Sequence, residues 1–389
     1  MLFALDEEHR SVQDMARSFA AAEIAPFALQ WDRDRTFPVD TLRRAAALGM
    51  AAVTVRSDVG GSDLSRLHAV IITEALAAAC PAIAAYLSIH NMCAGLIDKF
   101  GTTAQRQRWL PALVAMDRLA SYCLTEPGAG SDAAALSTRA CRDGDDYVLD
   151  GRKQFISGAG TEHGCYLVLA RTGGPGAGGI SAFIVDAGTA GLTFGPNEHK
   201  MGWHAQPTRA VILDQCRIPQ SHRLGREGDG FKIAMTGLDG GRLNIAACSL
   251  GGAQSALEAA TRYMSERHAF GHALATFQAL QFDVADLATR LEAARVMLYA
   301  AAAAVDRGDA DGTARVAGAK AFVTDTGFDV ANRALQLFGG YGYLSEYGIE
   351  KLVRDLRVHQ ILEGTNQIMR LIVARHHFGL SRQRERDGS

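Results

Sequence analysis

Residues 122–132 combine glycines with hydroxyl side chains directly after a strand-like run, and such a combination can bind a flat or phosphate-bearing ligand. The segment reads Tyr-Cys-Leu-Thr-Glu-Pro-Gly-Ala-Gly-Ser-Asp. Glycines let the backbone approach a ring closely, and the exposed N–H groups of a glycine-rich turn can donate to carbonyl or phosphate oxygens. Thr125 and Ser131 add hydroxyls. The segment is a candidate cofactor site, although an ordinary strand-to-loop turn has the same composition.

Residues 128–133 also match the glycine pattern G-x-G-x-x-A of dinucleotide-binding folds, and Asp150 lies near the expected position of the ribose-binding acid. A Rossmann unit needs a crossover of about a dozen residues before its next parallel strand. Here residues 133–138 lead almost directly into a hairpin with an Asp143-Gly144 turn. We therefore do not expect NAD binding, and we expect the second glycine-rich stretch, residues 173–179, to be a hairpin loop.

The elements that must position these residues fall into three regions. Residues 1–119 have helical periodicity, with Asp6 as the expected cap of the first helix. Residues 120–230 change to short β-like runs separated by turn signals such as Asp143-Gly144 and Asp150-Gly151, which predicts a domain of antiparallel hairpins. Residues 231–389 return to helices, expected at 231–268, 277–306, 312–338, 349–360 and 366–378, which can pack as a bundle.

Composition excludes several classes of function. The 389 residues are 48% hydrophobic, so the chain can bury a large core, and 40 basic against 42 acidic residues leave no net field for nucleic acid or an anionic membrane. The seven cysteines form no CxxC pair and no HExxH pattern occurs, so we expect reduced thiols and no metal site. The N-terminus lacks a signal-peptide or transit-peptide pattern and no long apolar stretch occurs, which predicts no membrane insertion.

Several segments together resemble the acyl-CoA dehydrogenase family, in the order in which that family carries them. The resemblance implies an α+β multidomain fold: an N-terminal α-helical domain, a middle β-barrel-like domain and a C-terminal four-helix-bundle domain. It also implies an FAD cofactor. The residues that correspond to the family's FAD contacts are Tyr122, Cys123, Leu124, Thr125, Gly130, Ser131, Phe155, Ile156, Ser157, Arg267, Phe277, Gln278, Gln336, Leu337, Phe338, Gly339, Gly340, Thr365, Asn366 and Gln367.

The resemblance assigns Glu363, in Leu362-Glu363-Gly364-Thr365, as the base that removes the α-proton of the substrate. A carboxylate can remove such a weakly acidic proton when a dry site raises its pKa and donors polarise the thioester oxygen. In the family a hydride leaves the β-carbon for the flavin at the same time. A plain helix-end carboxylate is the alternative for Glu363.

The substrate contacts that the resemblance implies are Ser131, Asp239, Gly240, Gly241, Arg242 and Arg375. Asp239 and Arg242 lie three residues apart, on one face of a helix. Isobutyryl-CoA dehydrogenases have Asn at the position of Asp239, which leaves that polar contact open. Arg375 could equally be a helix C-terminal charge that complements the helix dipole.

The substrate class follows from two departures from the common family pattern. Leu362 stands where many members have Tyr, and Phe155 stands where most have Trp. Together with the surrounding segments they resemble the isobutyryl-CoA dehydrogenases of valine breakdown, which oxidise isobutyryl-CoA to methacrylyl-CoA. Butyryl-CoA, 2-methylbutyryl-CoA and cyclic acyl-CoA dehydrogenases remain open as alternatives, as do an oxygen-using oxidase and a catalytically silent binding protein.

The resemblance also implies the partners of the protein. The family passes its electrons to an electron-transfer flavoprotein, and its FAD contacts cross subunits, so we expect a homotetramer. We expect a bacterial cytoplasmic protein, or a mitochondrial matrix protein if the chain is eukaryotic and processed.

Overall fold

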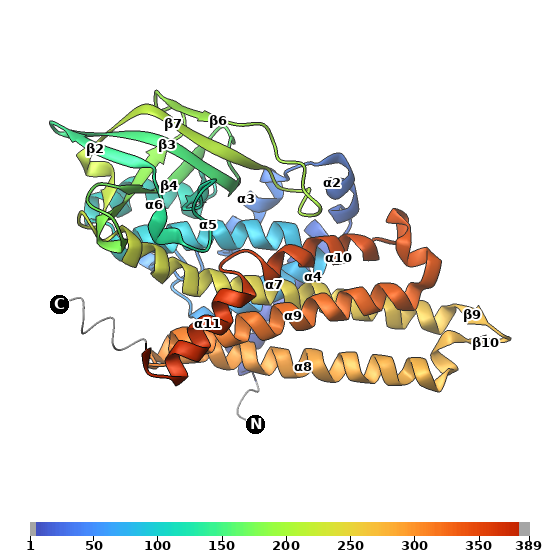
Figure 1. Cartoon of the computed structure of the whole chain (residues 1–389). Coiled ribbons are helices and arrows are strands. Elements are labelled where there is room, and N and C mark those ends of the chain that lie inside the picture. Colours follow the sequence, from blue (N-terminus) through green and yellow to red (C-terminus); the bar gives the residue numbers. More distant parts are fainter. Residues whose placement is uncertain (1–4, 381–389) are drawn as a thin grey trace.

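The computed structural model describes residues 5–380, in which helical, β and helical regions follow one another along the chain (Figure 1). The N-terminal region confirms the predicted helices, and Asp6 caps the first by accepting a hydrogen bond from the backbone N–H of His9 at 2.9 Å. Pro81 ends one helix and opens the next, where its missing N–H costs nothing. The helices are α1 (Glu7–Phe19), α2 (Ala28–Asp34), α3 (Val39–Ala47), α4 (Arg66–Ala79), α5 (Pro81–Phe100) and α6 (Thr103–Val114).

The middle region forms one twisted eight-stranded sheet within the described residues. Its strand order is β6-β7-β3-β2-β4-β5-β8, and β1 pairs with β4. The strands are β1 (Leu119–Cys123), β2 (Arg139–Asp143), β3 (Asp146–Ser157), β4 (Gly164–Arg171), β5 (Ile180–Asp186), β6 (Leu192–Phe194), β7 (Thr208–Pro219) and β8 (Arg223–Leu224).

The sheet differs from the predicted set of antiparallel hairpins in one predicted turn and in two parallel pairs, of which β2 with β4 joins only Arg139 to Arg171. β1 runs parallel to β4, with Leu119 opposite Gly164, because the chain makes a long excursion through β2 and β3 before it returns. The Asp150-Gly151 pair, predicted as a turn, lies inside the continuous strand β3, where a register irregularity absorbs the glycine. A Cβ at Gly151 would stand 2.5 Å from the Thr138 hydroxyl, so glycine serves close packing here.

The two glycine-rich stretches behave as the sequence predicts. After residue 132 the chain makes only a short 3₁₀ turn, Ala133–Ala135, before β2 pairs antiparallel with β3, so no Rossmann crossover helix follows the motif. Residues 173–179 connect the antiparallel strands β4 and β5 as a hairpin loop.

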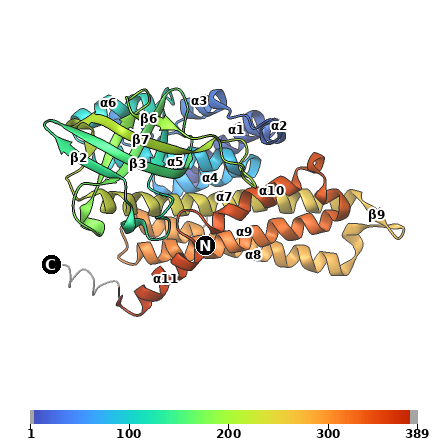
Figure 2. The same cartoon turned by 45° about the horizontal axis from the view of Figure 1, so that its top comes forward.

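The C-terminal region is a bundle of long helices that lie side by side in both views (Figures 1 and 2). The helices are α7 (Gly230–Glu266), α8 (Gln278–Arg307), α9 (Gly312–Phe338), α10 (Ile349–Arg357) and α11 (Asn366–His377). A small hairpin, β9 (His268–Ala269) with β10 (His272–Ala273), protrudes from the end of the bundle farthest from the large sheet (Figure 2).

Helix α7 is the central helix of the molecule. It packs against α4 and α5 of the N-terminal region and against α8 and α9 of the bundle, and it also contacts β5. Its Ala and Gly residues permit these close helix contacts: a Cβ at Gly251 would stand 2.2 Å from the carbonyl oxygen of Glu74 in α4. Helical and β regions therefore meet along α7. Among residues 5–380, no helix is both long and apolar enough to span a membrane.

Candidate active site

A cavity of about 720 Å³ lies where the β sheet, α5, α7, α11 and the segment before α11 meet. One face of α7 forms its wall, through side chains spaced three or four residues apart. The α7 residues that line it are Phe231, Met235, Leu238, Arg242 and Ile245. The residues predicted to bind cofactor or substrate that line it are Tyr122, Leu124, Thr125, Gly130, Ser131, Phe155, Ile156, Ser157, Arg242 and Arg375, together with Glu363.

Two glycines allow Glu363 to reach into this cavity. A Cβ at Gly241 of α7 would stand 2.7 Å from Glu363 Oε2, so only glycine lets the carboxylate lie against the helix. A Cβ at Gly364 would stand 2.6 Å from the Met369 side chain. Glu363 itself has a φ of 55°, a left-handed conformation that is disfavoured for a residue with a side chain. Tertiary packing therefore holds Glu363 in a backbone conformation that is locally disfavoured, and this places the carboxylate.

The backbone around Glu363 is held by two buried cations. Arg242 donates through Nε to the Glu363 carbonyl oxygen at 3.1 Å and pairs with Asp239 at 2.8 Å. Lys320, buried in α9, donates to the Gly364 carbonyl oxygen at 2.8 Å and to Asn366 Oδ1 at 2.9 Å. These bonds bind the backbone of the loop and leave the Glu363 carboxylate available.

Burial raises the pKa of Glu363 to about 7, although Arg242 and Lys320 act in the opposite direction. Glu363 Oε2 is buried and has no hydrogen-bond partner among the described residues. A carboxylate with these properties titrates near neutral pH and, in its ionised form, is a stronger base than an exposed one. The geometry and the electrostatics therefore suit proton abstraction.

A buried ion pair fixes the glycine-rich loop to the sheet. Lys153 Nζ donates to Glu126 Oε1 at 2.7 Å and to the Leu124 carbonyl oxygen at 3.1 Å. Glu126 also accepts backbone hydrogen bonds from Ser137 at 2.6 Å and Thr138 at 2.9 Å. Burial opposes the ionisation of Glu126, but Lys153 and these donors outweigh it and hold its pKa at about 2. These bonds therefore fix the glycine-rich loop both to strand β3 and to the segment before β2.

A β-bulge presents Phe155 to the cavity. The pairing of β3 with β7 shifts register between Lys153 and Ile156, and Phe155 adopts a φ of 60°. Such a bulge re-aims side chains that regular alternation would place on the other face. Phe155 is 64% exposed, and both it and Ser157 line the cavity.

These residues fit the FAD that the sequence implies. A Cβ at Gly130 would meet no heavy atom within 4 Å, so the glycine-rich loop leaves open space beside it. The buried Tyr122 hydroxyl has no hydrogen-bond partner among the described residues. An exposed aromatic ring at Phe155 and the hydroxyls of Thr125 and Ser131 complete a surface that suits a flat, polar-edged ring.

Other predicted residues lie close to the cavity without lining it. Cys123 is buried on the opposite face of β1, in the core of the sheet. Thr365 caps α11 and Asn366 bonds to Lys320, while Gln367 is exposed. Asp239 and Gly240 line a separate cavity on the other side of α7, where Asp239 also accepts a hydrogen bond from Thr313 at 2.8 Å. Their predicted contacts with ligand stay predictions.

A second group of predicted residues lies at the far end of the bundle, near the β9–β10 hairpin (Figure 1). Its members are Arg267, Phe277, Gln278, Gln336, Leu337, Phe338, Gly339 and Gly340. Arg267, Gln278 and Gln336 are exposed, whereas Phe338 packs in the core. The Arg267 guanidinium lies 5.3 Å from the centre of the Tyr341 ring. Within one chain this group does not line the cavity of Glu363.

The structure adds cavity residues that the sequence reasoning missed. Trp203 lines the cavity from the loop between β6 and β7, and Ile89 and Met92 line it from α5. Lys320 does not line the cavity, but it donates a hydrogen bond to the carbonyl oxygen of Gly364, next to Glu363. Trp203 directly follows Gly202 and could have been singled out on that signal, whereas nothing in the α9 sequence distinguishes Lys320 from a surface lysine.

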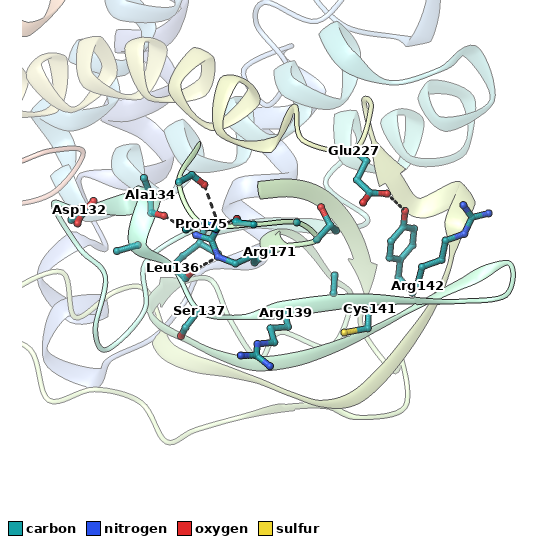
Figure 3. A pocket seen from close by; sticks show the side chains of 17 residues that line it. Asp132, Ala134, Leu136, Ser137, Arg139, Cys141, Arg142, Arg171, Pro175 and Glu227 are labelled. Atoms are coloured by element: carbon teal, nitrogen blue, oxygen red, sulfur yellow. Dashed lines mark hydrogen bonds between the residues drawn. The ribbon is translucent and has the colours of Figure 1, made fainter. Parts of the chain in front are cut away.

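A larger cavity, of about 1020 Å³, adjoins the first at Asp132 and Ala134 (Figure 3). Arg171 crosses it, but its guanidinium donates to four backbone carbonyl oxygens, among them Ala134 at 2.7 Å and Gly174 at 2.6 Å. It thereby ties the 173–179 loop to the segment before β2. No base comparable to Glu363 lines this cavity, so we assign the chemistry to the smaller one.

No cluster of three or more His, Cys, Asp or Glu residues that could hold a metal ion occurs within residues 5–380.

Comparison with protein families matches the chain along nearly its whole length. The N-terminal, middle and C-terminal domains of acyl-CoA dehydrogenase match residues 6–117, 121–216 and 228–378. The mitochondrial isobutyryl-CoA dehydrogenases of Dictyostelium discoideum and Bos taurus are 54% and 52% identical to it, over 95% of this chain and 89% of each relative.

Solved structures agree with these matches. Butyryl-CoA dehydrogenase from Megasphaera elsdenii superposes with a TM-score of 0.93 at 35% identity, covering 97% of this chain and 100% of that one. PigA, solved with FAD and proline, superposes with a TM-score of 0.93 at 29% identity, covering 98% and 100%. The three matched domains, the superposed fold and a buried carboxylate in a cavity lined by the predicted flavin segments agree: the chain belongs to the acyl-CoA dehydrogenase family of FAD-dependent oxidoreductases.

Proposed function

We propose that this protein oxidises isobutyryl-CoA to methacrylyl-CoA, with Glu363 as the base. The observation that carries the proposal is the position of the Glu363 carboxylate, buried against Gly241 in a cavity whose other walls are the predicted flavin segments. The names of the two most identical relatives reported above support the choice of substrate. Leu362 and Ile245, aliphatic residues in the wall beside Glu363, suit a short branched acyl group.

In this proposal the chain holds the substrate and moves one proton. Glu363 takes the α-proton, and its high pKa brings its basicity closer to that of the carbon acid. The backbone N–H of Glu363 donates to the thioester oxygen, which stabilises the negative charge that develops there. FAD, when bound, accepts the hydride from the β-carbon.

The residues proposed to hold the flavin ring are those of the glycine-rich loop and of the β3 bulge. Thr125, Ser131 and Ser157 supply hydroxyls to the ring edge, and Phe155 covers one side. Arg242 and Arg375, both lining the cavity, are proposed to contact the thioester substrate.

We further propose that the chain forms a homotetramer and passes its electrons to an electron-transfer flavoprotein. The exposed second group, with Arg267, Gln278 and Gln336, supports the assembly, because it lies away from the cavity of its own chain and is therefore free to contact the cofactor of a neighbouring one. Light scattering after gel filtration tests the assembly, and reduction of purified electron-transfer flavoprotein tests the partner. The compartment of the protein stays a prediction from its sequence.

A panel of acyl-CoA thioesters tests the proposed substrate. When the purified protein is mixed anaerobically with each thioester, its flavin absorbance should bleach. The second-order rate constant of bleaching should be highest for isobutyryl-CoA. A clear preference for butyryl-CoA or 2-methylbutyryl-CoA would overturn the isobutyryl assignment and leave the family chemistry intact. A colourless protein that takes up no FAD would indicate a silent binding protein, and rapid peroxide formation without an added acceptor would indicate an oxidase.

A further inference from the structure

Trp203 closes the cavity at one end. The cavity follows α7 from Phe231 to Ile245, and Glu363 meets the helix near the later part of this range, at Gly241. The Trp203 ring packs on His359 at a centroid distance of 5.5 Å, and His359 bonds to Ser249 at 2.7 Å, one turn beyond Ile245. Trp203 therefore lies past Glu363, on the side away from Phe231.

The backbone of Trp203 is held in place by a buried ion pair. The backbone N–H of Trp203 donates to Asp355 Oδ1 at 2.6 Å, and Asp355 pairs with Lys351 at 2.6 Å inside the protein. A Cβ at Gly202 would stand 2.6 Å from the backbone carbonyl of Arg354, so the loop lies directly on α10. Trp203 is 5% exposed and adopts a φ of 57°. Its position is fixed from behind by α10.

The space between Glu363 and Trp203 limits the length of the acyl group. From Gly241, against which the Glu363 carboxylate lies, to Ile245, the last cavity residue of α7, the helix rises by roughly 6 Å. Beyond that point the space belongs to Trp203, His359 and Ser249. An interval of this length is compatible with a short acyl group, and a longer straight chain would extend toward the indole.

We infer that Trp203 determines the chain-length specificity of this enzyme by closing the acyl end of the cavity. The inference deepens the proposed function and rests on it, because it assumes that an acyl-CoA is oxidised at Glu363. Trp203 sets the depth of the pocket, and Leu362 beside it sets the width at the reacting carbons.

Two substitutions of graded size test the inference. Trp203→Leu removes most of the ring, and Trp203→Phe removes only its outer part and the indole N–H. Flavin bleaching is measured for each variant with isobutyryl-, butyryl-, hexanoyl- and octanoyl-CoA. The ratio of the rate constants for hexanoyl- and isobutyryl-CoA should rise about tenfold or more in Trp203→Leu and less in Trp203→Phe, because one or two methylenes decide such discrimination.

Trp31→Leu is the matched control. Trp31 belongs to the same apolar core as Trp203 and is 8% exposed, but it does not line the cavity. Its loss should lower stability and leave the chain-length ratio unchanged. An unchanged ratio in both Trp203 variants that still bind FAD, or an equal change in Trp31→Leu, would overturn the inference.

A second measurement covers the case in which Trp203→Leu does not fold. The flavin absorbance shift on binding non-oxidisable thioethers of CoA reports occupancy directly, and it can be followed in the wild type and Trp203→Phe alone. Affinity should fall steeply beyond the short chains in the wild type and less steeply in Trp203→Phe; parallel profiles would contradict the inference. A wild type that prefers butyryl-CoA disproves only the proposed substrate, since the Trp203 test compares profiles between variants.

Discussion

The cavity around Glu363 and the exposed group around Arg267 carry the same kind of sequence signal but have opposite surroundings in the folded chain. In the cavity, each polar support has partners from the same chain: Lys153 on Glu126, Lys320 on the Gly364 carbonyl oxygen, Arg242 on Asp239. At the far end, Arg267 and Gln278 are exposed, and the two glycines 339 and 340 have nothing within 4 Å of a built Cβ.

This difference indicates that one chain by itself completes the cavity around Glu363, whereas it does not complete the surroundings of the exposed group around Arg267. The chemistry of the cavity depends on buried charges whose partners belong to the same chain. Substitutions of these residues should therefore change the free energy of unfolding or the pKa of Glu363. In the far group, Arg267, Gln278 and Gln336 are exposed, and these three residues should act only when a ligand or another chain is present. Four predictions test this contrast.

The largest effect is expected from Glu363→Gln, which keeps the shape of the side chain and removes the base. The rate of flavin bleaching by isobutyryl-CoA should fall roughly 10²- to 10⁴-fold, while the flavin spectrum of the resting protein remains. Glu7→Gln, at an exposed position in α1, is the control and should behave as wild type. Bleaching that survives Glu363→Gln undiminished would show that another group is the base.

Lys153→Met should be the most destabilising change in the cavity region, because it leaves the buried Glu126 without its cation. We expect a loss of about 3–5 kcal/mol in the free energy of unfolding, measured by urea denaturation, and loss of bound FAD. The double variant Glu126→Gln/Lys153→Met should recover part of this loss, since it removes the unpaired charge. A single variant within 1 kcal/mol of wild type would mean that the pair is not the anchor of the loop.

The pH profile should report Glu363 directly. Because burial raises its pKa to about 7, the carboxylate is protonated and inactive at lower pH. The bleaching rate should rise about tenfold per pH unit up to that region and then level off. Lys320 lowers the pKa of Glu363 by its charge, so Lys320→Met should move the midpoint upward. A midpoint that stays in place, or moves down, would contradict the assigned coupling.

The smallest effect is expected from Arg267→Ala in the far group. It should weaken FAD retention by about tenfold, the value of one charge-assisted hydrogen bond, without changing the unfolding of the FAD-free protein. FAD content after dialysis and thermal unfolding measure the two quantities. Arg262→Ala, another exposed arginine of α7, is the control. Arg267→Ala that destabilises the FAD-free protein would remove the contrast between the two regions.

Much of the fold could be predicted from the sequence, because its signals are local. Helix caps such as Asp6 and the helical periodicity of residues 231–268 act within a few residues, and both agree with the structure. The parallel pairing of β1 with β4 could not be predicted from local patterns, since it depends on where the chain returns after β2 and β3. For the same reason the Asp150-Gly151 pair was misread as a turn.

The sequence by itself determined the order of the domains, the family and the identity of the acidic residue before Gly364 as the candidate base. Only the tertiary structure decided that this carboxylate is buried against Gly241 with a pKa of about 7, and that Trp203 closes the pocket beyond it. The physical reason is that motifs report short-range backbone requirements, whereas desolvation, ion pairing and cavity depth arise from segments far apart in the chain that meet only after folding.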